Sequence, residues 1–270
     1  MSITLAQGLM LAVVAFVCGL EAHLEAFFIF RPIVVGFFAG IVLGDVELGC
    51  KAGAVAELSY MGMTTVGGTV PPNPLMAGMM TVVLAYTLQV EPATALGLSL
   101  PFALLAQWMS IIFNTSFAMF LGPLDRAAEK ADISRYNVLF FSAWMIVASC
   151  YALLTFLSAY ALQNQITAFV GAFPEWLIHG LEVAGGIMPA VGLTLLMVVM
   201  VRPQNIAYLF IGFVIATLNG AIGSAHEIIG GSYGANIIPV AVAGAAFAFF
   251  SYQNDQRAAK GKGGSDDGGI

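Results

Sequence analysis

The sequence contains few charged residues: Asp, Glu, Lys and Arg together make up only 9% of its 270 residues. Because a water-soluble domain carries charge on roughly a quarter of its residues, this scarcity excludes an ordinary soluble protein. Nine Lys and Arg stand against fifteen Asp and Glu, a net charge of -6, so no basic surface is available for nucleic acid. The shortage of charge therefore indicates an integral membrane protein.

Cysteine is scarce as well, and its placement favours no special chemistry. Cys18, Cys50 and Cys150 lie far apart in apolar surroundings and form no Cys-x-x-Cys pair. We interpret them as buried, inert thiols rather than as a disulfide or a metal site. The first residues lack the basic segment and the Ala-x-Ala site of a cleaved signal peptide, so the first apolar run is expected to stay in the protein.

Motifs for catalysis are also missing. The sequence has no Walker A motif, no glycine-rich nucleotide loop and no cluster of candidate metal ligands. His23, His179 and His226 are isolated from one another, and each is interpreted as a membrane-interface or packing residue. We therefore expect no cofactor, no metal and no catalytic residue. If the protein takes part in group transfer, the phosphorylated residue belongs to another polypeptide.

Apolar residues, in contrast, make up 60% of the chain, and the mean hydropathy is +0.92. A helix needs roughly 20 apolar residues to cross the bilayer, and thirty Gly suit helices that pack closely in lipid. These features predict an all-α, polytopic membrane protein, with a membrane-embedded domain in 1–250 and a disordered polar tail in 251–270. The candidate spans are 3–20, 101–124, 137–162, 183–201, 205–223 and 233–250.

The stretch 28–98 is apolar but repeatedly broken. The interruptions are prolines, glycines and charged side chains, among them Pro32, Asp45, Glu47, Lys51, Glu57 and the run 67–74. Short apolar segments of this kind predict re-entrant or discontinuous helices, which are tolerated only inside protein or beside a watery cavity. Gly36, Gly40 and Gly44 recur every four residues and predict a closely packed helix face.

Residues 164–182 show an amphipathic pattern. After Pro174, which suits a first helical turn, Glu175, His179 and Glu182 fall on one face. We interpret the stretch as an interfacial helix on the outer side of the membrane. A polar face turned toward a solute is the alternative.

The basic residues predict the orientation of the chain in the membrane. One cluster lies in the polar loop 125–136 and another lies in the tail 251–270. Four predicted spans separate the two clusters, so both can face the same side. We therefore predict that the loop and the tail are cytoplasmic.

Ionisable residues inside the bilayer are costly and therefore indicate function. Glu57 is the strongest candidate, with Thr64 on the same helical face, because its carboxylate could accept hydrogen bonds from the hydroxyls of a polar solute. The alternative is a structural ion pair with Lys51 or Arg31. Asp45 is either a second functional carboxylate or a turn residue at the interface.

Two polar amides complete the predicted binding site. Asn73 stands among prolines, which cannot continue a helix, so free backbone carbonyls and an amide are available to a hydroxylated ligand; a plain extracellular turn is the alternative. Gln107 shares a helix face with Asn114, where hydrogen bonding between helices is the alternative to ligand contact. The predicted substrate-binding residues are thus Glu57, Asn73, Thr64, Asp45 and Gln107.

Several separated segments resemble one known family. Phe30-Arg31-Pro32-Ile33, 40–45, 53–58 and Pro72-Asn73 are similar to enzyme IIC of the mannose-type (mannose–fructose–sorbose) sugar phosphotransferase systems. The stretches 67–81 and 176–192 look most like the N-acetylgalactosamine/galactosamine branch. The resemblance covers residues 3–250, and its motifs occur in the family's order.

The resemblance implies a subunit of a phosphoenolpyruvate-dependent transport system in the cytoplasmic (inner) membrane of a bacterium. Such a IIC subunit pairs with a IID membrane subunit, in higher oligomers of IIC–IID pairs. It binds an amino sugar, N-acetylgalactosamine or galactosamine, or a related hexose from outside. A cytoplasmic IIB protein, phosphorylated on histidine by IIA, then phosphorylates the arriving sugar. The missing phosphoacceptor in this chain agrees with that division of labour.

The residues also allow two other functions. A secondary transporter coupled to protons could use Glu57 or Asp45 as its titrating carboxylate, since discontinuous helices are common in such proteins. A membrane scaffold without transport agrees less well, because a scaffold does not need broken helices with buried carboxylates. The presence of IID-like and IIB partners would distinguish the phosphotransferase subunit from the secondary transporter.

Overall fold

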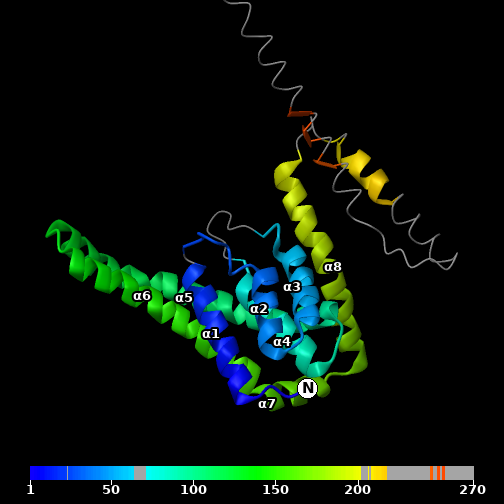
Figure 1. Cartoon of the computed structure of the whole chain (residues 1–270), viewed down its shortest axis with the longest axis horizontal. Helices are drawn as coiled ribbons and strands as arrows, with labels where there is room; N and C mark the ends of the chain where they lie inside the picture. The colour runs from blue at the N-terminus through cyan, green and yellow to red at the C-terminus, as the bar shows by residue number, and fades with distance from the viewer. Residues whose placement is uncertain are drawn as a thin grey trace, which may run out of the picture. The chain divides into compact units, whose positions relative to one another are not determined.

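The computed structural model of the chain is built from helices (Figure 1). It divides into two units, Met1–Val199 and Met200–Ile270. Every regular element of the described residues is a helix, which confirms the predicted all-α class. The structure describes residues 1–22, 24–63, 71–201, 206, 208–217, 244–245, 248–249 and 251–252. The predicted span 233–250 and the tail 251–270 therefore lie almost wholly outside the described residues.

Three short helices form the centre of the first unit: α2 (Pro32–Leu43), α3 (Val46–Tyr60) and α4 (Pro74–Leu88). With 12, 15 and 15 residues, they are about 18–23 Å long, less than the roughly 30 Å of a bilayer core. The prediction of discontinuous helices in 28–98 is therefore confirmed. Prolines in the first turns of α2 and α4 help to set where these helices begin.

A tight turn joins α2 to α3. Gly44 ends α2 with a φ of 80°, a left-handed conformation that glycine adopts without steric cost. Asp45 then caps α3 by accepting a hydrogen bond from the backbone N–H of Leu48 at 2.9 Å. Gly44 is therefore a turn residue, and the prediction that it belongs to a packing face is wrong.

The other two predicted glycines do form a close contact between α2 and α3. A Cβ on Gly36 would lie 2.7 Å from the carbonyl oxygen of Gly49, and a Cβ on Gly40 would lie 3.0 Å from the Cα of Gly49. Side chains at these positions would separate the two backbones. The hairpin therefore depends on glycine, as small-residue contacts between membrane helices generally do.

The helices α5 (Pro92–Glu129) and α6 (Ile133–Phe156) form a long hairpin that extends away from the central helices (Figure 1). α6 continues as a π-helix, η1 (Leu157–Ala161). The polar loop predicted at 125–136 is wrong in extent, because only Lys130–Asp132 connects the two helices. The charged side chains of this stretch lie on exposed helix ends instead, and polarity alone does not distinguish an exposed helix end from a loop.

Two further long elements complete the first unit. α1 (Leu5–Glu21) lies beside α6 (Figure 1). α8 (Glu175–Met200) approaches the end of α3, where Gly192 lies against the backbone of Leu58 and Ser59. α8 places Leu181 and Met188 against the buried residues of the central helices. The short α7 (Gln163–Gly171) connects the π-helix to α8.

The prediction of one separate amphipathic helix over 164–182 is wrong. The structure divides this stretch between α7 and the first turns of α8, because Pro174 starts a new helix. His179 and Glu182 consequently lie on α8, where His179 Nδ1 is 3.6 Å from Glu182 Oε2 and both side chains are exposed. A polar face on the first turns of a long apolar helix has the same sequence pattern as a surface helix.

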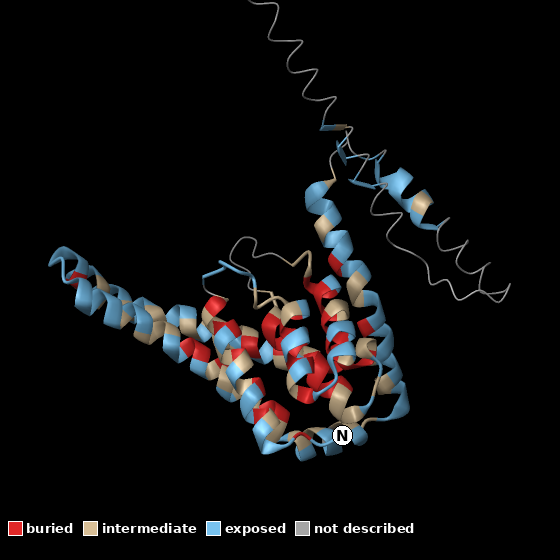
Figure 2. Ribbon diagram, viewed as in Figure 1, coloured by how far each residue is buried: buried red, intermediate tan, exposed pale blue. Residues whose placement is uncertain are grey.

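Buried residues concentrate in the central helices (Figure 2). α4 is buried continuously over Leu75–Ala85, as expected of an apolar helix surrounded by protein. The outer parts of α5, α6 and α8 instead expose large apolar side chains such as Met119 and Phe141, which lipid or another subunit can cover. The three helices long and apolar enough to cross a membrane, among the described residues, are Pro92–Glu129, Ile133–Ala161 and Glu175–Met200.

The three cysteines are free thiols. Cys18 is buried as predicted, whereas Cys50 is exposed on α3 and Cys150 is partly exposed on α6. The prediction of burial is therefore wrong for two of them. An apolar sequence neighbourhood does not establish burial in a membrane protein, because the surface that faces lipid is apolar too.

Candidate functional site

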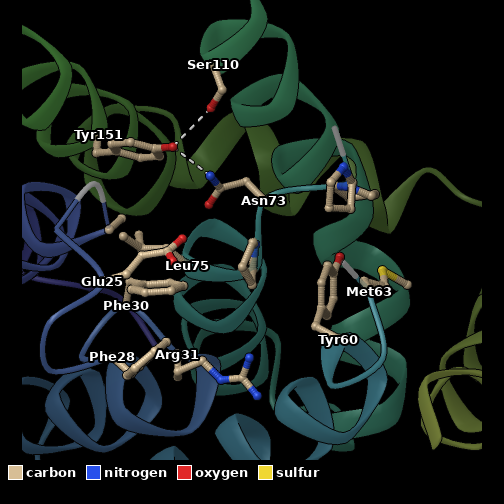
Figure 3. Close-up of a pocket in the computed structure, with 14 residues that line it drawn as sticks. Glu25, Phe28, Phe30, Arg31, Tyr60, Met63, Asn73, Leu75, Ser110 and Tyr151 are labelled. Atoms are coloured by element: carbon tan, nitrogen blue, oxygen red, sulfur yellow. Dashed lines mark hydrogen bonds between the residues drawn. The ribbon is translucent and has the colours of Figure 1, made fainter. Parts of the chain in front are cut away.

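A cavity of about 470 Å³ lies between the loop that joins α1 to α2 and the helices α3 to α6 (Figure 3). Its wall combines amide, hydroxyl and charged side chains with aromatic rings and prolines. This mixture of apolar surface and a few convergent polar groups is typical of small-molecule sites. The lining residues are Ala22, Glu25, Phe28, Phe30, Arg31, Tyr60, Met63, Pro71, Pro72, Asn73, Pro74, Leu75, Ser110 and Tyr151.

Asn73 is the one predicted binding residue that lines this cavity, among those that the structure describes. Its side-chain Oδ1 caps α4 by accepting from the backbone N–H of Met76 at 3.0 Å, and its own backbone N–H donates to the carbonyl oxygen of Ala103 on α5 at 3.2 Å. Its amide Nδ2 donates to the hydroxyl of Tyr151 on α6 at 2.6 Å. Asn73 therefore caps α4 and forms hydrogen bonds to two other helices, α5 and α6.

Tyr151 and Ser110 extend the contacts of Asn73 into a neutral network (Figure 3). The hydroxyl oxygens of Tyr151 and Ser110 are 3.2 Å apart, and Ser110 donates to the backbone carbonyl oxygen of Ala106 at 3.0 Å. Because the single proton of Ser110 is used in that bond, Tyr151 donates to Ser110 and accepts from Asn73. Side chains from α5 and α6 thus meet the cap of α4 at one uncharged patch of the cavity wall.

Glu57 does not line the cavity, although it lies close to it. Its Oε1 forms an ion pair with the guanidinium of Arg31, and its Oε2 accepts from the backbone N–H of Ile33 at 3.4 Å. Arg31 does line the cavity. Of the alternatives left by the sequence, the structure therefore shows the ion pair with Arg31, while Lys51 pairs with Glu47 at 2.7 Å on an exposed face.

The remaining predicted residues lie elsewhere. Asp45 is an exposed helix cap at the α2–α3 turn, away from the cavity lining. Gln107 lies on α5 one turn before Ser110 and is not a lining residue. Thr64 lies outside the described residues. The structure thus brings Asn73 to the cavity directly and Glu57 to it through Arg31.

Five polar lining residues were not predicted as binding residues: Glu25, Arg31, Tyr60, Ser110 and Tyr151. A signal for Ser110 was present, because it lies three residues after Gln107 and four before Asn114 and so shares their helix face. A buried tyrosine usually finds a hydrogen-bond partner for its hydroxyl, but nothing in the sequence of α6 indicates that the partner of Tyr151 is Asn73.

Glu21 holds the loop that forms one wall of the cavity. This last residue of α1 is 5% exposed, and its Oε1 accepts hydrogen bonds from the backbone N–H groups of Phe27 at 2.6 Å and Phe28 at 2.9 Å. Glu25 and Phe28 have φ values of 48° and 55°, which are uncommon for residues other than glycine. The carboxylate therefore stabilises a strained loop that presents Phe28 and Arg31 to the cavity.

Replacing Glu21 with Ala is expected to loosen this loop. The substitution removes a charged acceptor of two hydrogen bonds and should lower the free energy of unfolding by about 1–3 kcal/mol. Hydrogen exchange at the amides of Phe27 and Phe28 should become faster. Glu47→Ala, on the exposed face of α3, is the control and should change stability by less than about 0.5 kcal/mol. Unchanged exchange at both amides in Glu21→Ala would contradict this role.

Comparison with known proteins identifies the family. Residues 5–255 match the family described as the PTS system sorbose-specific IIC component. The chain belongs to this family. This confirms the resemblance to enzyme IIC of the mannose-type phosphotransferase systems, so the chain is a subunit of a membrane transporter that works with other phosphotransferase components.

Two curated relatives show how the chain is placed within the family of IIC components. The chain is 44% identical over 252 residues to N-acetylgalactosamine permease IIC component 1 of Escherichia coli (strain K12), and the match covers 93% of this chain and 90% of the relative. It is 26% identical over 237 residues to the mannose-specific EIIC component of the same organism, covering 85% and 89%. The resemblance to the N-acetylgalactosamine branch therefore agrees with the higher of the two identities.

Two solved structures share the fold of this IIC component. A structure titled only as a membrane protein has a TM-score of 0.77 and 24% identity, and the match covers 93% of this chain and 97% of that one. A complex of the mannose transporter ManYZ with microcin E492 has a TM-score of 0.58 and 24% identity, covering 94% and 97%. At this identity the comparison supports the fold alone, which is the fold predicted for a helical membrane protein.

Proposed function

We propose that this IIC component carries N-acetylgalactosamine, galactosamine or a related hexose inward across the cytoplasmic (inner) membrane of a bacterium. It pairs with a IID membrane subunit, in a higher oligomer of such pairs, and presents the sugar to phosphorylated IIB, which receives its phosphoryl group from IIA. The observation that carries this proposal is a cavity with a neutral hydrogen-bonding patch on its wall, in a chain that is 44% identical to an N-acetylgalactosamine permease component.

The cavity suits a hydroxylated solute. Its volume of about 470 Å³ falls within the range of roughly 300–1,000 Å³ that small-molecule sites occupy. One amide proton of Asn73 is donated to Tyr151, and the second is available to donate to a sugar oxygen. The aromatic rings of Phe28 and Phe30 offer apolar surface to the C–H face of a sugar ring. Arg31, oriented by Glu57, offers further N–H donors.

Phosphorylation would retain the transported sugar. The phosphoryl group passes from a histidine nitrogen of IIB to a sugar hydroxyl oxygen. A P–N bond breaks, a P–O bond forms, and the hydroxyl proton goes, in the net reaction, to the freed histidine nitrogen. The product carries charge, and moving an ionised group through an apolar environment is strongly unfavourable.

The rival hypothesis of a proton-coupled transporter has less support. It requires a carboxylate free to titrate in the transport path. Glu57 is paired with Arg31, and Asp45 is an exposed helix cap.

We propose, as the basic residues predict, that the α5–α6 connection and the tail 251–270 face the cytoplasm.

Uptake measurements in cells that express the chain with its IID, IIB and IIA partners test this function. Labelled N-acetylgalactosamine or galactosamine should accumulate as the phosphorylated sugar, ahead of mannose and sorbose, and accumulation should stop when IIB is absent. Undiminished accumulation of unmodified sugar without IIB, abolished by collapse of the proton gradient, would support the secondary transporter instead.

Within this system, Asn73→Ala is expected to weaken sugar binding about five- to thirty-fold, or about 1–2 kcal/mol, because one hydrogen bond to the sugar is lost. Binding should be measured per folded complex, since the same change removes the cap of α4. Asp45→Ala is the control for the loss of a helix cap alone, because Asp45 caps α3 but does not line the cavity. Equal effects of both substitutions on affinity would remove Asn73 from the binding site.

A further inference from the structure

The hydroxyl of Tyr60 is buried without a partner at the wall of the cavity. Tyr60 is the last residue of α3, is 3% exposed and lines the cavity. Among the residues that the structure describes, no group forms a hydrogen bond with its Oη. Buried polar groups in native proteins are nearly always paired, and an unpaired one lowers stability. An unpaired hydroxyl at a binding cavity therefore requires an explanation.

Packing does not explain the hydroxyl. The ring of Tyr60 belongs to an apolar cluster with Ala56, Ala77, Leu96 and Ala103, and a phenylalanine would fill the same space. Burying the hydroxyl oxygen lowers the stability of the fold. Within the described residues, no hydrogen bond to this oxygen offsets that loss. A function in ligand binding would account for its presence.

A second tyrosine in the same cavity provides the contrast. Tyr151 is 2% exposed, and its hydroxyl is paired with both Asn73 and Ser110. The close-up shows the two rings on different parts of the cavity wall, with Asn73 between the helices that carry them (Figure 3). The cavity thus holds one tyrosine hydroxyl that is satisfied by the protein and one for which the described residues provide no partner.

We propose that Tyr60 is a sugar-binding and specificity-determining residue whose hydroxyl is satisfied by a hydroxyl of the transported sugar. This inference depends on the proposed function of the cavity. A phenolic hydroxyl can donate and accept, so it matches a sugar hydroxyl, which can also do both. Met63 packs against the same cluster and lies beside the Tyr60 ring in Figure 3; its flexible thioether can move to admit a ligand. A sugar that lacks the matching hydroxyl would leave Tyr60 unpaired and bind weakly.

The test compares Tyr60→Phe with Tyr151→Phe in the full-length chain purified with its co-expressed membrane partner. Tyr60→Phe should leave the thermal midpoint of the sugar-free protein unchanged or higher, because it removes an unpaired hydroxyl. It should also weaken binding of the sugar that the wild type transports about ten- to a hundred-fold. Tyr151→Phe should instead lower the thermal midpoint of the sugar-free protein, because Asn73 and Ser110 each lose a partner.

Deoxy sugars then identify the contact. In the wild type, each deoxy analogue of the transported sugar should bind more weakly than the parent sugar. In Tyr60→Phe, one analogue should lose almost nothing relative to the parent, because the hydroxyl it lacks no longer has a partner. Wild-type affinity in Tyr60→Phe, or a fall in its thermal midpoint equal to that of Tyr151→Phe, would overturn the inference. A wild-type complex that binds none of the sugars would overturn the proposed function itself, and the inference with it.

Discussion

Glu57→Gln is expected to reduce the amount of correctly folded protein in the membrane as well as its affinity for sugar. The substitution keeps the shape of the side chain but leaves the guanidinium of Arg31 without its counter-charge. Removing one partner of a buried ion pair costs about 3–5 kcal/mol. Because Arg31 is 34% exposed, water offsets part of this penalty, and we expect a loss of about 2–3 kcal/mol in the free energy of unfolding.

The double variant Arg31→Gln/Glu57→Gln tests the cause of that loss. It removes both charges, so its stability should be higher than the sum of the two single substitutions predicts. Glu47→Gln, which breaks the exposed pair with Lys51, is the matched control and should have almost no effect. Sugar binding per folded complex separates structure from function. A fully stable Glu57→Gln protein that no longer binds sugar would show that Glu57 contacts the sugar itself.

Gly49→Ala is expected to disrupt the central hairpin of α2 and α3. The new Cβ would lie 2.5 Å from the carbonyl oxygen of Gly36 and 2.6 Å from the Cα of Gly40, and both of these are backbone atoms that cannot turn aside. Forcing an extra carbon into a packed contact costs about 1–3 kcal/mol and sometimes more. We expect a loss of about 3 kcal/mol for this variant, measured as a lower thermal midpoint and a lower yield of folded protein.

Gly186→Ala is the matched control for this substitution. Gly186 also lies in the interior of a helix, α8, but a Cβ there would meet no described atom within 4 Å. Since alanine favours a helix over glycine by about 0.5–1 kcal/mol, this variant should be slightly more stable than the wild type. Similar stability changes in the two variants would show that helix propensity, rather than the close contact, decides the outcome at Gly49.

The site could be predicted from the sequence only where local chemistry set the structure. Asn73 was found because prolines around it end any helix and leave a polar amide at an apolar depth. Glu57 was found because a carboxylate in an apolar segment requires a partner. Its partner was one of two candidates in the sequence, and only the packing of α3 against the start of α2 selected Arg31 over Lys51.

Tyr60, Ser110 and Tyr151 were missed because each lies in a different helix, at the end of α3, in α5 and in α6. A single hydroxyl in an apolar helix has many local explanations, such as a bond to a backbone carbonyl one turn earlier. The residues form one cavity only after the helices are packed. The sequence of one helix does not specify how its neighbours are oriented against it.

The sequence by itself determined the helical class, the membrane environment and the broken central region. These features depend on composition, on the length of apolar runs and on the backbone limits of proline and glycine, all of which act locally. Only the tertiary structure decided that α5 continues past the start of the expected loop, that Glu21 secures the α1–α2 loop, and which tyrosine hydroxyl is paired. Those outcomes depend on contacts between residues far apart in the chain, because burial and pairing are properties of packed helices rather than of sequence segments.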